Sequence, residues 1–218
     1  MIVHIIDTET TGLTPQEGKL IEVAIAAYDL DCGLISAKSF LVNKNVTVED
    51  VEKTRSIHNI NPKLVMENGY SEVQDLNFMG STLLAHNADF DRQWFNFGDD
   101  VKWVCTQKDI KWPKISNASL VATALAHGVG VVAAHRALTD VLTIVNILDR
   151  VRESQNLNVL IDNALLPRLK YKADVGFNSK HLAKNAGFNW DQGEKCWIKK
   201  MTVEEAAMQL PFSVSKIN

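Results

Sequence analysis

Apolar runs separated by turn-forming residues dominate the first part of the chain. They predict strands at residues 2–7, 20–30 and 34–42, because runs of this length and pattern are typical of strands that face a core. The tripeptide Asp31-Cys32-Gly33 between the second and third runs has the composition of a short hairpin turn. We therefore expect the first three strands to form an antiparallel meander.

Strand-like and helix-like patterns alternate beyond this meander. The expected strands are residues 82–86 and 101–105, and the expected helices lie around 47–55, after 87, at 119–127 and at 136–153. Hairpin strands followed by strands that helices separate are typical of an α/β domain on a mixed sheet. We assign residues 1–153 to this domain and expect a five-stranded mixed sheet flanked by helices.

The remaining residues, 155–218, have the pattern of a separate small α+β module. YKADVGF predicts a strand, NSKHLAKNAG a helix, and FNWDQGEKCWIKKM a hairpin. Thr202 and Glu205 have the spacing of a capping box at the start of a last helix. The hairpin region also combines aromatic and basic residues, namely Trp190, Trp197, Lys195, Lys199 and Lys200. Because aromatic rings stack on bases and lysines contact phosphates, nucleic-acid binding is one hypothesis for the module. The alternative is that both tryptophans form its core.

Composition narrows the class of protein. With 46% hydrophobic and 22% charged residues the chain has the values of a soluble globular protein. No apolar run approaches the roughly 20 residues that a membrane span needs, and the N-terminus lacks the features of a signal peptide. The three cysteines are far apart, which argues against a disulfide framework or a zinc site. We therefore expect a cytoplasmic protein with no membrane partner.

Charge is distributed unevenly along the chain. Residues 1–150 carry 13 Lys+Arg against 19 Asp+Glu, and residues 151–218 carry 10 against 7. The acidic part suits bound cations, and the basic part suits an anionic polymer. Ordinary variation of surface charge is the alternative.

Two acids end the first predicted strand. Asp7 and Glu9 are two residues apart, so they project from the same face if the strand continues through them. Two adjacent carboxylates repel each other, and burying them without a cation is costly. Oxygen ligands of this kind are what Mg²⁺ or Mn²⁺ prefers. The alternative is a solvated end of a strand.

Two further segments carry candidate chemistry. LLAHNADFDRQWF predicts a strand that delivers Asn87 and, in the following turns, Asp91. AAHRALTDVLTIVNIL predicts a helix with Asp140 on its apolar side and His135 in the segment before it. A lone acid on an apolar helix face is anomalous unless a cation neutralises it. A histidine near such a site is suited to take a proton from water at neutral pH.

Four acids and one histidine are the composition that phosphodiester hydrolysis with two divalent ions requires. IIDTETTGL, LLAHNADFDRQWF and HRALTD also resemble, in order, the three motifs of the DnaQ-like DEDDh exonuclease family. SIHNIN is similar to that family's Ile-His-Gly-Ile-Thr segment, with Asn59 in place of glycine, and WVCTQKDIKWPKISNASL resembles the exonuclease X branch. The resemblance covers residues 1 to about 150, and it does not extend to the tail.

This resemblance implies an RNase H-like fold and removal of mononucleotides from 3′ ends with two divalent ions, Mg²⁺ or Mn²⁺. By position, it implies metal ligands at Asp7, Glu9, Asp91 and Asp140, and a general base at His135. It implies substrate contacts for the residues around these motifs, which are Thr8, Thr10, Thr11, Gly12, Leu13, His58 and Asn87. Leu13 is either a wedge against the terminal base or a plain core residue.

The resulting hypothesis is a metal-dependent 3′→5′ exonuclease that acts on single-stranded or 3′-overhanging DNA and releases nucleoside 5′-monophosphates. Partners would be nucleic acid and, as further candidates, replication or repair proteins. A second hypothesis keeps the site and replaces DNA by short RNA or RNA 3′ ends, which a contact to the 2′-hydroxyl would distinguish. A third is a non-catalytic nucleic-acid-binding subunit, whose hallmark would be the loss of one of the five residues.

Overall fold

The computed structural model describes residues 1–71, 76, 78–132 and 135–217, and it divides the chain into two compact units, Met1–Leu165 and Leu166–Asn218. None of the helices in these described ranges has the length and apolar character that crossing a membrane requires.

A mixed five-stranded sheet forms the centre of the first unit, in the order β3-β2-β1-β4-β5. Its strands are β1 (Ile2–Thr10), β2 (Leu20–Asp29), β3 (Gly33–Leu41), β4 (Thr82–Ala85) and β5 (Lys102–Cys105). The first three strands pair antiparallel, whereas β4 and β5 continue the sheet in parallel. The predicted meander and the predicted five-stranded mixed sheet are both confirmed.

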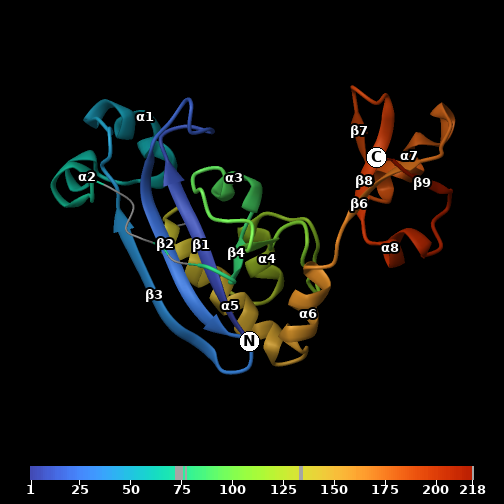
Figure 1. The fold of residues 1–218 in the computed structure, drawn as a ribbon, viewed down its shortest axis with the longest axis horizontal. Coiled ribbons are helices and arrows are strands. Elements are labelled where there is room, and N and C mark those ends of the chain that lie inside the picture. The colour runs from blue at the N-terminus through green and yellow to red at the C-terminus, as the bar shows by residue number, and fades with distance from the viewer. Residues whose placement is uncertain (72–75, 77, 133–134, 218) are drawn as a thin grey trace. The chain divides into compact units, whose positions relative to one another are not determined.

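Six helices accompany the sheet within the described part of this unit: α1 (Val48–His58), α2 (Pro62–Asn68), α3 (Ala88–Arg92), α4 (Leu120–Ala126), α5 (Ala137–Arg152) and α6 (Leu157–Ala164). Figure 1 shows α5 lying across one face of the sheet, and α3 toward the end opposite the N-terminus. Helices α2 and α6 were not predicted from the sequence.

Alternation along β1 assigns its residues to two layers. Val3 and Ile5 belong to the core cluster that α5 completes with Val141 and Ile144, whereas Ile6 belongs to the cluster on the opposite face. Because successive strand residues alternate between faces, the odd-numbered residues beyond Ile5 also face the side of α5. This periodicity directs the first two acids toward that helix.

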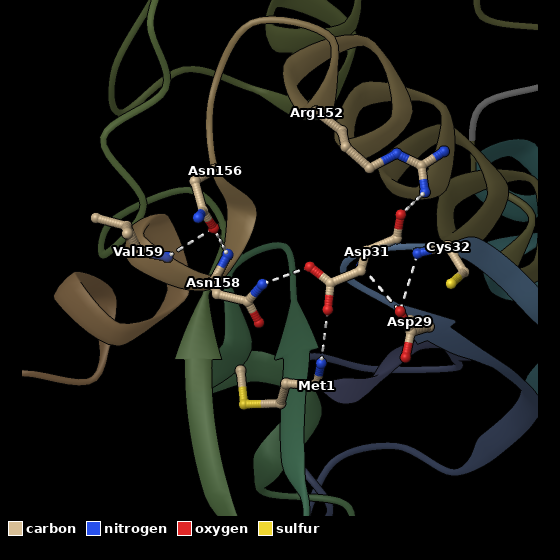
Figure 2. Close-up of polar contacts among 8 residues, drawn as sticks. All are labelled: Met1, Asp29, Asp31, Cys32, Arg152, Asn156, Asn158 and Val159. Atoms are coloured by element: carbon tan, nitrogen blue, oxygen red, sulfur yellow. Dashed lines mark hydrogen bonds and ion pairs between the residues drawn. The ribbon is translucent and has the colours of Figure 1, made fainter.

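The boundary between the units lies later than the predicted one after residue 153. Four residues of α6, Leu157, Leu160, Ile161 and Ala164, are buried in the same cluster as those of α5, so this helix belongs to the first unit. Figure 2 shows that the end of α5 and the start of α6 both bind the turn between β2 and β3: Arg152 of α5 donates to the carbonyl of Asp31 at 3.2 Å, and Asn158 of α6 donates to Asp31 Oδ1 at 2.7 Å. Asn218, the end of the predicted module, lies outside the described residues.

The second unit contains a four-stranded antiparallel sheet in the order β7-β8-β6-β9. Its elements are β6 (Leu169–Ala173), the 3-10 turn η1 (Phe177–Ser179), α7 (Lys180–Asn185), β7 (Asn189–Asp191), β8 (Cys196–Met201), α8 (Val203–Ala207) and β9 (Val214–Lys216). The predicted capping box is present, because the backbone N–H of Thr202 donates to Glu205 and that of Glu205 donates to the Thr202 hydroxyl. Trp197 packs on the apolar core of this unit, while Trp190 is half exposed.

We expect α6 to be required for the stability of the first unit. Its large buried residues, Leu157, Leu160 and Ile161, should together contribute more than about 4 kcal/mol, a large share of the roughly 5–15 kcal/mol of a typical domain. The fragment 1–165 should therefore melt in one cooperative transition, and the fragment 1–153 at least about 10 °C lower. Circular dichroism melting of the two fragments tests this, and equal midpoints would contradict it.

Candidate metal centre

Three carboxylates meet at the carboxyl end of β1. Asp7 and Glu9 project from this strand, and Asp140 reaches them from the first turn of α5, so that one ligand atom of each lies within 4.8 Å of the others. The first predicted strand and the predicted helix that carries Asp140 therefore bring their acids to the same place. Carboxylate oxygens in this number and spacing fit a divalent cation such as Mg²⁺ or Mn²⁺.

Asp91 lies beside this cluster and is held differently. It is buried in α3, and its Oδ1 accepts a hydrogen bond from the Thr8 hydroxyl at 2.8 Å. Thr8 was predicted to contact substrate, but its side chain is buried and its hydroxyl is used by Asp91. Thr8 projects from the opposite face of β1 from Asp7 and Glu9. Its hydrogen bond holds Asp91 in place, which is a structural role.

The pKa values of all four acids are raised, chiefly by burial, and neighbouring carboxylates add to the effect for Asp7 and Glu9. Burial raises the pKa of Asp7 well above its usual range, and the neighbouring carboxylates add to the effect. Burial and the charge of Asp140 raise the pKa of Glu9 to about 8. Burial raises the pKa of Asp91 to about 7 against the opposing hydrogen bond from Thr8, and it also raises the pKa of Asp140. Such a set favours either protons or a bound cation.

A fifth acid, Glu22, was missed by the sequence analysis. It lies directly opposite Glu9 in the pairing of β1 with β2 and is only 2% exposed. Arg136 donates to both of its oxygens at 3.0 and 3.1 Å, and the backbone N–H of Ala137 donates at 3.2 Å. Glu22 thus fixes the start of α5, and with it Asp140. The available signal was an acid in the middle of an otherwise apolar strand.

His135 lies in the segment before α5, as predicted, and its side chain is exposed. Its backbone adopts a left-handed conformation with φ of 66°, and its N–H donates to Asp140 Oδ2 at 3.2 Å. A side chain other than glycine rarely adopts this conformation. The turn therefore ties the backbone of His135 to an acid of the cluster and leaves its imidazole free to meet a ligand.

The loop after β1 is pinned by close backbone contact. A Cβ atom on Gly12 would lie 2.8 Å from the Cα of Gly18, so the crossing of these two segments requires glycine. The hydroxyl of Thr10 donates to the Gly12 carbonyl at 2.7 Å, and that of Thr11 accepts from the N–H of Lys19 at 2.8 Å. Both hydroxyls thus shape the loop.

Leu13 is presented by this loop. Its side chain is 75% exposed, which rules out the alternative of a core residue. The side-chain amide of Gln93, next to α3, donates to the Leu13 carbonyl at 2.9 Å. The exposed leucine is therefore tied to the segment that follows α3, the helix that carries Asp91.

Two further predicted substrate residues differ from each other in the structure. His58 is buried, its Nδ1 accepts from the N–H of Ile60, and its Nε2 bonds the hydroxyl of Thr54. Both ring nitrogens are occupied, so His58 is placed as a structural residue rather than one that meets substrate. Asn87 is exposed, in a left-handed conformation at the start of α3, with no hydrogen bond from its side chain to the helix. It remains available for a ligand.

Comparison with known proteins adds the following. A family model described as "Exonuclease" matches residues 4–148, and one described as a domain of unknown function (DUF8626) matches residues 169–217. DNA polymerase III subunit epsilon of Treponema pallidum (strain Nichols) is 35% identical over 94 residues, which cover 41% of this chain and 42% of that protein.

Solved structures share the fold. The zinc-bound complex of E. coli exonuclease I with single-stranded DNA matches with a TM-score of 0.57 and 18% identity, over 81% of this chain and 48% of that one. A full-length 3′-exonuclease matches with a TM-score of 0.55 and 16% identity, over 71% and 83% of the two chains. The chain spans less than half the length of the polymerase subunit and of exonuclease I.

The raised pKa values predict an unusual pH dependence of stability. The pKa of Glu9 rises from 4.5 to about 8 in the folded protein, and the pKa of Asp91 rises from 3.8 to about 7. Between the ordinary and the raised pKa, the folded protein keeps a proton on each acid that the unfolded chain has lost. The free energy of unfolding should therefore decrease as pH rises through this window, by roughly 2 kcal/mol or more.

Thermal melts in EDTA at pH 5.5 and pH 8 measure this effect, and adding millimolar Mg²⁺ or Mn²⁺ at pH 8 should restore the lost stability. Asp7→Asn, which removes one charge from the cluster, should reduce both effects. A flat profile in EDTA would show that the acids do not repel one another in the folded protein.

We expect Arg136 and Glu22 to be strongly coupled. Arg136→Met leaves the buried carboxylate of Glu22 without its partner and should lower the free energy of unfolding by roughly 2–3 kcal/mol. The loss is expected to be smaller than for a fully buried pair, because Arg136 is about half exposed. Adding Glu22→Gln should recover part of that loss. A double-mutant cycle by urea unfolding measures the coupling, and additive effects would contradict it.

Proposed function

Because the chain belongs to the exonuclease family, whose model matches residues 4–148, we propose that it removes nucleotides one at a time from the 3′ end of DNA. Family membership makes the protein a nuclease and confirms the DnaQ-like resemblance that its motifs predicted. The observation that carries the proposal is the convergence of Asp7, Glu9 and Asp140 within 4.8 Å.

In the proposed mechanism, two divalent ions, Mg²⁺ or Mn²⁺, would be held by Asp7, Glu9, Asp91 and Asp140. Bound ions would supply the acidity that water needs to become a nucleophile and the positive charge that stabilises the departing oxygen. The raised pKa values support this role for the acids, because they mark a site that lacks positive charge. Arg136 offsets this only in part: its charge lowers the pKa of Glu9, but its guanidinium group is hydrogen-bonded to Glu22, and the pKa of Glu9 remains raised.

His135 is proposed as the base that accepts a proton from the attacking water on a ring nitrogen. The water oxygen forms a bond to phosphorus while the bond from phosphorus to the 3′ oxygen of the preceding nucleotide breaks. The released product is a nucleoside 5′-monophosphate. Exposure of the imidazole and the tie of its backbone to Asp140 support this role, because the base must reach a water beside the acids.

Leu13 is proposed to lie against the base of the terminal nucleotide. Its apolar side chain is largely exposed and therefore available to pack against a base. The pinned loop of Thr10 to Gly12 and the carbonyl contact from Gln93 hold it in place. Asn87 is proposed as a polar contact to the same nucleotide.

DNA is the polymer we propose, and RNA is the alternative. The names of the relatives support both: one is a subunit of DNA polymerase III, another was solved with single-stranded DNA, and a third recognises the 3′ end of a histone mRNA stem-loop. We place DNA first because the relative with 35% identity is a DNA polymerase subunit. For the same reason replication or repair proteins are proposed as partners.

We expect 5′-labelled single-stranded DNA to shorten stepwise with Mg²⁺ or Mn²⁺ and to stay intact in EDTA. Asp7→Asn and Asp140→Asn should each reduce the rate by about a thousandfold or more, because each removes a proposed ligand. His135→Ala should reduce it about 10²–10⁴-fold, as expected for loss of a general base. Gel electrophoresis of the labelled products measures all three.

Lys63→Ala, an exposed lysine on α2, serves as the control and should retain the wild-type rate. Release of the 5′ label as a mononucleotide in the first turnover would contradict the proposed polarity. Faster degradation of a matched RNA oligonucleotide would favour the RNA alternative. Binding without cleavage under every metal tested would favour a non-catalytic subunit.

A further inference from the structure

The sheet of the second unit has one covered face and one open face. Along β6, Tyr171 and Ala173 belong to the apolar core, so Lys170 and Lys172 face the opposite side. Helices α7 and α8 both contribute residues to that core. The two helices therefore cover the same side as Tyr171, and the lysines lie on the side they leave open.

Strand pairing brings a third lysine to the open face. Lys200 of β8 lies directly opposite Lys170 of β6 in the antiparallel register, and both are exposed. Side chains in such opposed positions share a face and lie about 4.5–5.5 Å apart at their Cβ atoms, so like charges there are unfavourable. We refer to Lys170, Lys172 and Lys200 as the lysine face.

Among the described residues, Lys170, Lys172 and Lys200 form no ion pair with an acid. Asp174, which directly follows β6, accepts hydrogen bonds from the hydroxyls of Ser213 and Ser215. Glu205 pairs with Arg168 at 3.0 Å. Residues 166–218 carry nine Lys+Arg against five Asp+Glu, a net charge of +4 in a chain whose total is −3. Positive charge is therefore concentrated in this unit.

The structure changes which lysines are available. The hairpin sequence suggested Lys195, Lys199 and Lys200 as phosphate contacts, but Lys199 lies on the covered side, where its Nζ donates to the Ala186 carbonyl at 2.8 Å. The two lysines that join Lys200 come from β6, about thirty residues earlier in the chain. Trp190 is 51% exposed, but it lies opposite Trp197, whose ring packs on the core, so it belongs to the covered side and not to the lysine face.

We propose that the lysine face binds the phosphate backbone of single-stranded nucleic acid, the polymer whose identity rests on the proposed function. Repeated phosphates would offset the repulsion between Lys170 and Lys200, neither of which forms an ion pair with a carboxylate of the described residues. Binding by the lysine face is independent of the metal centre, so it does not require cleavage.

Equilibrium binding of the full chain to a fluorescently labelled oligo(dT) in EDTA, at a series of salt concentrations, tests this. Lys170→Ala/Lys200→Ala should weaken binding several-fold and reduce the slope of log affinity against log salt by about 1.4, since each single-strand phosphate contact contributes about 0.7. The matched control, Lys184→Ala/Lys216→Ala, removes the same charge from exposed positions of the same unit and should keep nearly the wild-type slope.

Unfolding is separated from binding by a melt of each variant. Because the substitution removes two opposed like charges, Lys170→Ala/Lys200→Ala should melt at the wild-type temperature or above it. Lys172→Gln leaves that cross-strand pair untouched and should lower the slope by about half as much. A slope equal to the wild type in both variants would overturn the inference.

The outcomes also distinguish this inference from the proposed function. Unchanged binding with intact Mg²⁺-dependent cleavage overturns the lysine face alone, whereas loss of binding in the face variant without any cleavage by the wild type counts against the nuclease mechanism alone. Vesicles of phosphatidylcholine with phosphatidylserine provide the remaining comparison. Vesicle binding that depends on the lysine face, with oligonucleotide binding unchanged, would assign the face to a lipid surface and overturn the proposal.

Discussion

Repulsion among carboxylates at the end of β1 is the constraint on which the first unit depends. Asp7, Glu9 and Asp140 share a small space, and Asp91 lies close enough to raise the pKa of Asp7. Folding brings these charges together only because the apolar halves of β1 and α5 pack on each other. The hydrophobic core thus stabilises an arrangement that electrostatics alone would disperse.

Only one of the buried acids near the end of β1, Glu22, forms an ion pair with an arginine within the described residues. Glu22 receives two hydrogen bonds from Arg136 and one from the start of α5, whereas the acids around Asp7 receive no comparable cation from the described residues. One carboxylate therefore holds the framework, while the others form no such ion pair within the described residues. The same helix start links both roles, because Asp140 follows Ala137 by one turn.

The sequence predicted what depends on local periodicity and motif order. The acids were found because Asp7 and Glu9 interrupt an apolar strand and Asp140 lies on an apolar helix face. Pairings between distant segments were not found: Glu22 with Arg136, Thr8 with Asp91, and Lys170 with Lys200 all depend on a register or a packing angle that the sequence does not state. Helix α6 was readable in principle, since its buried residues recur at three and four positions.

Strand register has a further consequence for how this site can vary among related sequences. A slip of β1 by one residue against β2 would exchange its two faces, so that Thr8 would take the place of the acids beside α5. The register shift between Glu9 and Thr10 marks where this restriction ends. Insertions before it would move the acids away from α5, while length changes in the loop that follows would leave their positions unchanged. Variation in length among related sequences should therefore accumulate on the downstream side of the bulge, where it changes the surroundings of the acids but not their arrangement.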